Sequence, residues 1–205
     1  MNEIRLAFRM VHIDNIRYIV ENGFVHKDSP YASPDYVSIG DISVIESRAK
    51  QQYKGTNLDD CIPFYFGPRS PMLYVIQHGY NGVTQHNAED IVYCAISLKE
   101  IYESDVRCFF SDGHALDRMT TFYPKSELGN INKIIKYDDV FTQYWNNRTP
   151  FDDSKRKKEA ELLVRDELPP EYIKGFVVYN GKAKETLVDI GISENKIVIR
   201  QDFYY

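Results

Sequence analysis

The sequence predicts an α+β fold, in which strands and helices are mixed without a regular alternation. Short runs rich in β-branched and aromatic residues have the length and composition of buried strands. Amphipathic stretches lie between some of these runs, but a repeating strand–helix–strand pattern, which would indicate a doubly wound parallel sheet, is absent. The 205 residues are enough to bury one core, and we expect residues 1–205 to form a single domain.

Strands are predicted where apolar, β-branched and aromatic side chains dominate a short run. In chain order, these runs are residues 6–11, 62–66, 91–96, 106–110, 176–179 and 197–199. Prolines at 63, 68 and 71 predict that the second strand breaks into a rigid turn.

Helices are predicted where a capping side chain precedes an amphipathic stretch. Asp14 is expected to cap a short helix that ends at Gly23. Asp41 is expected to cap a helix that reaches Arg48, and Ser97 to cap one over residues 98–102. A fourth helix is expected over residues 182–190. The polar segments 26–38 and 146–158 are expected at the surface, the first of them as a flap.

The composition, with 43% hydrophobic and 27% charged residues, is typical of a soluble globular protein. The sequence contains no run of about 18 apolar residues that could span a membrane. The N-terminus lacks the layout of a signal peptide, so we expect a cytoplasmic protein. The three cysteines and five histidines show no metal-binding spacing, and we expect no metal site. The GxGxxG, P-loop and GxSxG motifs are also absent.

The charge is unevenly distributed along the chain. The net charge is −5, yet residues 118–158 contain nine Lys or Arg and five Asp or Glu, which gives this segment a charge of +4. Basic side chains interleaved with aromatic ones suit a single-stranded nucleic acid, whose bases stack while its phosphates are neutralised. A solvated charged face over an aromatic core would give the same pattern. The aromatic residues of the segment are Phe122, Tyr123, Tyr137, Phe141, Tyr144, Trp145 and Phe151.

Polar residues stand at two predicted strand ends. His12 follows the first strand and precedes a helix, where an imidazole and free N–H groups can meet a ligand. Side chains that only cap the helix would give the same pattern. Asp112 and His114 follow the strand at 106–110, which fits either acid–base chemistry or a turn held by an Asp hydrogen bond.

A third position of interest joins a basic run to an apolar one. Residues 155–158 are all basic, Glu159 and Glu161 follow, and residues 162–164 are apolar. In a helix the two glutamates lie on different faces, whereas in a strand they share one face. A carboxylate at the edge of an apolar segment is suited to electrostatic catalysis, although an ordinary surface helix has the same composition.

Together these segments resemble the DarT family, the DNA ADP-ribosyltransferase toxins of DarTG toxin–antitoxin pairs. The resemblance covers nearly the whole chain, and its pieces occur in the family's order. The longest and most specific is IPFYFGPRSPML at residues 62–73. The shorter pieces are RMVHIDNI at 9–16, IGD at 39–41, IESRA at 45–49, FSDGHA at 110–115 and EAELL at 159–163.

The resemblance implies an ADP-ribosyltransferase fold, which is a split mixed β-sheet with flanking helices and an NAD⁺ cleft between the sheet halves. It implies that Arg48 and Glu161, rather than Glu159, are the catalytic residues. It also implies that NAD⁺ binds at His12, Ile13, Asp14, Gly23 and Arg48. Three positions depart from the common pattern: Val11 replaces a frequent Thr, Gly113 a frequent Ser, and Glu159 a frequent Gln.

The implied reaction splits NAD⁺, releases nicotinamide and attaches ADP-ribose to a base of single-stranded DNA, thymidine being favoured over guanosine. Arg48 is expected to orient the phosphates and polarise the base, since its pKa makes it a poor proton acceptor. The implied partner is a DarG-type macrodomain antitoxin. The residues expected to contact DNA are His114, Tyr144, Trp145, Arg148, Lys155, Arg156, Lys157 and Lys158.

Two other classes of function fit the residues alone. One is an ADP-ribosyltransferase that acts on RNA or protein, or an NAD⁺ glycohydrolase. The other is a non-catalytic module that binds single-stranded DNA. An aromatic and basic segment favours a nucleic acid over a glycohydrolase, and binding alone would require neither Arg48 nor Glu161.

Overall fold

The computed structural model describes residues 2–146, 149 and 152–205, and the described strands form an eight-stranded mixed sheet and a small hairpin. The order across the large sheet is β10-β9-β5-β1-β4-β8-β6-β7, with β9 and β10 parallel and the other neighbours antiparallel. Its strands are β1 (Leu6–His12), β4 (Cys61–Tyr65), β5 (Ile91–Ser97), β6 (Cys108–Ser111), β7 (Phe122–Pro124), β8 (Glu161–Arg165), β9 (Ile173–Val178) and β10 (Ile197–Ile199). The expected α+β class is confirmed.

The sheet is split between β1 and β4, which share the single residue pair Phe8 and Tyr65. Two positions further in that register, Pro63 would lie opposite Met10, but proline has no N–H to donate to the ladder. The Pro63 carbonyl instead accepts a hydrogen bond from the side chain of Arg9, at 3.0 Å. The two halves of the sheet therefore diverge from this point, which opens space between β1 and β4.

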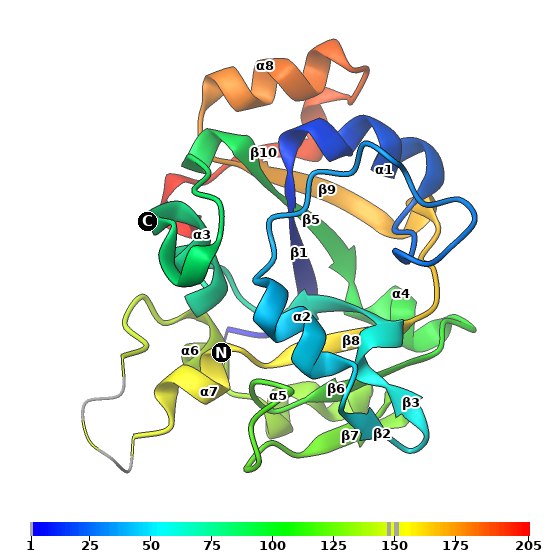
Figure 1. Ribbon diagram of the computed structural model, residues 1–205, viewed down its shortest axis with the longest axis vertical. Helices are drawn as coiled ribbons and strands as arrows, with labels where there is room; N and C mark the ends of the chain where they lie inside the picture. The colour runs from blue at the N-terminus through cyan, green and yellow to red at the C-terminus, as the bar shows by residue number, and fades with distance from the viewer. Residues whose placement is uncertain (1, 147–148, 150–151) are drawn as a thin grey trace.

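Helices cover both halves of the sheet (Figure 1). They are α1 (Ile16–Asn22), α2 (Ile42–Arg48), α3 (Pro71–His78), α4 (Leu98–Glu103), α5 (Ile131–Ile134), α6 (Tyr137–Phe141), α7 (Ser154–Lys158) and α8 (Gly181–Asp189). The hairpin of β2 (Gln52–Tyr53) and β3 (Thr56–Asn57) follows α2 directly. No helix among the described residues is long and apolar enough to cross a membrane.

Helix caps agree with the sequence at two positions and differ at a third. The carboxylate of Asp41 accepts a hydrogen bond from the Ser43 N–H, and the Ser97 hydroxyl accepts one from the Glu100 N–H, as predicted. At the first helix, however, the cap is His12, whose Nδ1 accepts from the Asp14 N–H. The prediction of Asp14 as the cap was wrong because a 3₁₀ turn (Ile13–Asn15) precedes α1 and moves the helical start.

The core lies on both faces of β1. Ala7 and Val11 pack into the larger buried cluster, whereas Phe8 packs into a second cluster with Leu73 of α3 and Tyr93 of β5. This alternation is that of a strand buried on both faces. Arg9 shares the face of Ala7 and Val11 and is half-buried, so its guanidinium has limited access to water.

Candidate active site

The candidate active site is built around a buried ion pair between Arg48 and Glu161. Nη2 of Arg48 lies 2.9 and 2.7 Å from the two carboxylate oxygens of Glu161. The Glu161 side chain is fully buried and that of Arg48 is 10% exposed. Burial disfavours the charged guanidinium, but the Glu161 carboxylate outweighs it and raises the pKa of Arg48 above its ordinary value. Arg48 is therefore held as a cation, largely away from water, against the carboxyl group of Glu161.

Secondary structure fixes each partner of the pair. Arg48 is the last residue of α2, which lies in front of the sheet near β8 (Figure 1). Glu161 is the first residue of β8, where it pairs with Tyr65 of β4. Its carboxylate also accepts a hydrogen bond from the Ala115 N–H, at 3.2 Å. The loop after β6 thus supplies a donor to the glutamate, which fixes its orientation.

The strand alternative for residues 159–164 holds only from Glu161 onward. Glu159 and Ala160 precede β8, and Glu159 is buried near the end of α7. Burial raises the pKa of Glu159 to about 7, an effect that Lys155 opposes and Glu161 strengthens. Burial has the opposite effect on the basic His114, because it disfavours the charged imidazolium and so lowers the pKa, although Glu161 opposes this shift. Burial therefore favours the neutral forms of both Glu159 and His114 beside the ion pair.

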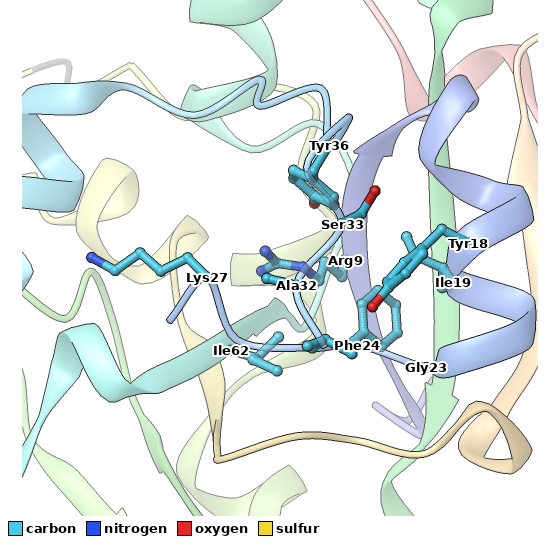
Figure 2. A pocket seen from close by; sticks show the side chains of 11 residues that line it. Arg9, Tyr18, Ile19, Gly23, Phe24, Lys27, Ala32, Ser33, Tyr36 and Ile62 are labelled. Carbon is cyan, nitrogen blue, oxygen red and sulfur yellow. The ribbon is translucent and has the colours of Figure 1, made fainter. Parts of the chain in front are cut away.

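Two adjoining cavities lie beneath the segment 26–45, between β1 and β4. The larger, of about 340 Å³, is lined by Arg48, Tyr65 and Met10 among others. The smaller, of about 200 Å³, is lined by Tyr18, Phe24 and Gly23 among others (Figure 2). Both are lined by Arg9, Val25, Lys27, Tyr36 and Ile62. Together they make an elongated site at the split in the sheet.

The polar segment 26–38 was predicted to be a flap, and it covers this site through specific contacts. The side chain of Asn15 accepts from the Val37 N–H and donates to its carbonyl, at 2.9 and 2.8 Å. Lys27 pairs with Asp59 at 3.0 Å. The Ser29 hydroxyl donates a hydrogen bond to the carboxylate of Glu167, which follows β8. The flap is therefore anchored to both halves of the sheet.

The residues predicted to bind NAD⁺ fall into two groups. Arg48 lines the larger cavity and Gly23 the smaller. Gly23 has a φ of 78°, and a side chain there would overlap the Leu168 carbonyl, so only glycine fits. His12, Ile13 and Asp14 do not line either cavity. His12 caps the 3₁₀ turn and packs edge-on against His86, at 4.9 Å between ring centres.

The residues of the basic run 155–158 do not share one environment. Lys155 is exposed and Lys157 partly buried. Arg156 pairs with Asp112 and Asp153, at 2.8 and 2.7 Å.

Lys158 is fully buried, and its Nζ donates to the carbonyls of Val140 and Thr142. Burial lowers the pKa of Lys158 to about 7. The prediction that residues 146–158 are exposed is therefore wrong at Lys158.

The other residues predicted to contact DNA differ in their exposure and surroundings. Tyr144 is 78% exposed, and Trp145 is partly buried with its indole N–H donating to the Tyr205 hydroxyl. His114 follows β6 and lies within electrostatic reach of Glu161. Arg148 lies outside the described residues. Gly113 packs against the Arg156 guanidinium, which would have to move to admit the serine common in the family.

Sequence reasoning missed Arg9, Tyr36 and Lys27 as residues of the site. The signal for Arg9 was present, because a charged side chain stands in the middle of the apolar strand LAFRMV. A charge in the middle of a mostly apolar strand points to a partner or a ligand. Tyr36 and Lys27 belong to the flap, and the sequence contained no signal that placed them over a cavity.

Comparison with known proteins assigns the chain to a family. Residues 8–205 match the family described as "ssDNA thymidine ADP-ribosyltransferase, DarT". The chain belongs to the DarT family. A DNA ADP-ribosyl transferase from Escherichia coli O127:H6 is 30% identical over 184 residues, which are 87% of this chain and 82% of that protein. The resemblance seen in the sequence motifs is thereby confirmed.

Solved DarT structures share the fold over the full chain. The DarT of Thermus sp. 2.9 in complex with ADP-ribosylated ssDNA is 27% identical, with a TM-score of 0.83 over 100% of this chain and 98% of that one. The same Thermus protein in complex with NAD⁺ matches with a TM-score of 0.78, over 100% and 99% of the two chains. The expected ADP-ribosyltransferase fold with a split sheet is thus confirmed.

Proposed function

We propose that this protein transfers ADP-ribose from NAD⁺ to thymidine in single-stranded DNA, with Arg48 and Glu161 as the catalytic pair, and that residues 1–205 act as one domain. The observation that carries this assignment is the buried Arg48–Glu161 ion pair, whose arginine lines the larger cavity. The co-substrate is NAD⁺, as the DarT complexes with NAD⁺ and with carba-NAD⁺ support. The enzyme class expected from the sequence is confirmed by the DNA ADP-ribosyl transferases among the relatives.

The chemistry follows from the charge of the pair. Breaking the bond between nicotinamide and ribose builds positive charge on the anomeric carbon, which a nearby carboxylate stabilises. Glu161 supplies this carboxylate, and the Ala115 N–H and the start of β8 hold it in place. Because Glu161 is fully buried and both of its carboxylate oxygens accept from Arg48, substrate binding must break at least one of these hydrogen bonds to free an oxygen. Nη1 of Arg48 is buried without a partner among the described residues and is thus ready for a ligand.

The acceptor is proposed to be a thymidine that has left its stack. The family description names thymidine and single-stranded DNA, and the Thermus relative was solved with ADP-ribosylated ssDNA. Tyr144 is exposed and Trp145 is partly buried, and both are proposed to offer aromatic surface for neighbouring bases. His114 is positioned near Glu161 and is proposed to contact the base.

The proposed biological role is that of a toxin paired with a DarG-type antitoxin in the cytoplasm. A fusion of DNA ADP-ribosyl transferase and DNA ADP-ribosyl glycohydrolase from Thermosipho africanus is 30% identical over 185 residues. These residues are 89% of this chain and 45% of the fusion protein. An enzyme that removes the modification is thus joined to the relative in one chain, which supports the expected partner.

The test is an incubation with NAD⁺ and defined oligonucleotides, read by mass spectrometry. We expect one ADP-ribose on single strands that contain thymidine, and none on single strands that lack it. Modification of guanosine alone would replace the thymidine assignment. Free ADP-ribose without modified DNA would indicate a glycohydrolase. Modification of RNA or protein in place of DNA would change the assigned acceptor. Intact NAD⁺ would indicate a module that only binds DNA.

A further inference from the structure

Arg9 occupies the centre of the elongated site, and the catalytic assignment leaves it without a role. It lies on β1 and lines both cavities. Figure 2 shows its guanidinium among the lining side chains, with Tyr18 and Ile19 on one side and Lys27 on the other. Arg48 lines only the larger cavity, and Gly23 only the smaller. Arg9 is therefore placed where a ligand that fills both cavities passes from one to the other.

The guanidinium of Arg9 is held in place but its charge is not neutralised. Nη1 donates to the Pro63 carbonyl at 3.0 Å, and the group lies 5.9 Å from the centre of the Phe24 ring. Nε is buried and has no hydrogen-bond partner among the described residues. No carboxylate in the described part of the chain lies within ion-pair distance of Arg9.

Arg9 is half-buried, and its buried Nε forgoes a hydrogen bond that a ligand can supply. Guanidinium groups bind phosphate oxygens through charge-assisted hydrogen bonds in a fixed, planar geometry. Lys27 is the other cation that lines both cavities, but its side chain is 52% exposed and already paired with Asp59. The site therefore offers one unneutralised cation at its centre, which fits an anionic group in the middle of a ligand.

We propose that Arg9 binds the pyrophosphate of NAD⁺ and thereby sets the direction of the dinucleotide in the site, an inference that rests on the proposed function. The nicotinamide ribose then lies in the larger cavity, next to Arg48. The adenosine lies in the smaller cavity, among the aromatic rings of Tyr18, Phe24 and Tyr36. Arg9 is a positioning residue in this arrangement, since it binds the part of NAD⁺ that does not react.

The experiment compares ligand binding by calorimetry for the wild type, Arg9→Gln and Arg9→Lys. The ligands are NAD⁺, ADP-ribose and adenosine. For Arg9→Gln we expect the dissociation constants of NAD⁺ and ADP-ribose to rise together, by about 10- to 100-fold, because both contain the pyrophosphate. Adenosine binding should be unchanged. Arg9→Lys keeps the charge without the fork of donors and should fall between the wild type and Arg9→Gln.

Kinetics and a matched control complete the test. In transfer assays with DNA, Arg9→Gln should raise KM for NAD⁺ and leave kcat within a few-fold. Arg17 is exposed on α1, and Arg17→Gln should behave as the wild type in every measurement. Thermal unfolding without ligand shows whether Arg9→Gln is folded, and we expect no loss of stability because an unpaired charge is removed.

Three results would overturn the assignment of Arg9. The first is that Arg9→Gln binds ADP-ribose as tightly as the wild type. The second is that only the affinity for NAD⁺ falls, which would place Arg9 at the nicotinamide. The third is that the affinity for adenosine falls as much as the affinity for NAD⁺. In each case the wild type still binds NAD⁺ and modifies DNA, so the proposed function stands. If the wild type itself binds neither NAD⁺ nor ADP-ribose, it is the proposed function that fails.

Discussion

Replacing Glu161 by glutamine removes one charge from the buried pair while keeping the size and shape of the side chain. The Arg48 side chain is 10% exposed, so its charge would be left in a nearly dry environment without a counter-ion. Removing one partner of a buried pair typically costs about 3–5 kcal/mol. The glutamine oxygen can still accept from Arg48 and from the Ala115 N–H, which places the expected loss near the lower end.

The loss of stability and the loss of activity have separate magnitudes. In a chain of this size, about 1 kcal/mol lowers Tm by roughly 2–4 °C, so Glu161→Gln should unfold roughly 6–12 °C below the wild type. Removing a preorganised group that stabilises the transition state costs about 10²–10³ in rate. The double variant Arg48→Gln with Glu161→Gln contains no lone charge. It should recover most of the stability and none of the transfer activity.

The assay combines thermal unfolding with single-turnover transfer to an oligonucleotide at saturating NAD⁺. Glu46→Gln, at an exposed position of α2, controls for the loss of a charge near the site. Glu159→Gln should lower the rate far less than Glu161→Gln. Transfer near the wild-type rate by folded Glu161→Gln would refute the catalytic assignment, and the reverse ranking of the two glutamates would show that Glu159 is the catalytic one. An unchanged Tm in Glu161→Gln would mean that the ion pair does not stabilise the fold.

Three further predictions concern other charged groups. The folded-state pKa of Lys158 is about 7, below its ordinary 10.5, so between these values the unfolded chain binds more protons than the folded one. The free energy of unfolding should therefore rise with pH from 7 toward 9. Denaturant titrations of Lys158→Met should show no such rise. Neutralising Lys155 and Lys157 together should lower the salt dependence of oligonucleotide binding by about 0.7 in log–log slope for each lost phosphate contact, and an unchanged slope would place DNA elsewhere. Although His12 lines neither cavity, the family resemblance places NAD⁺ beside it, so His12→Ala should weaken NAD⁺ binding more than it slows transfer. A variant that only loses thermal stability would show that His12 is a helix cap.

Local sequence determined the elements whose signals lie within a few residues of one another. Apolar, β-branched and aromatic side chains dominate the six strand runs, with Arg9 and Arg107 as charged exceptions, and all six were found. Asp41 and Ser97 cap helices because their side chains reach an N–H two or three residues away. The family motifs identified the chemistry for the same reason, since each motif is a short contiguous string.

Tertiary structure decided everything that depends on contacts between distant segments. Arg48 and Glu161 are 113 positions apart, and only the pairing of β4 with β8 brings the glutamate to the arginine. The basic run shows the same limit of local reasoning. Its sequence is uniform, yet Lys158 faces the buried carbonyls of Val140 and Thr142 while Lys155 is exposed. The role inferred for Arg9 likewise depends on the split of the sheet at Pro63, because the separation of two strands places this half-buried charge at the centre of a binding site.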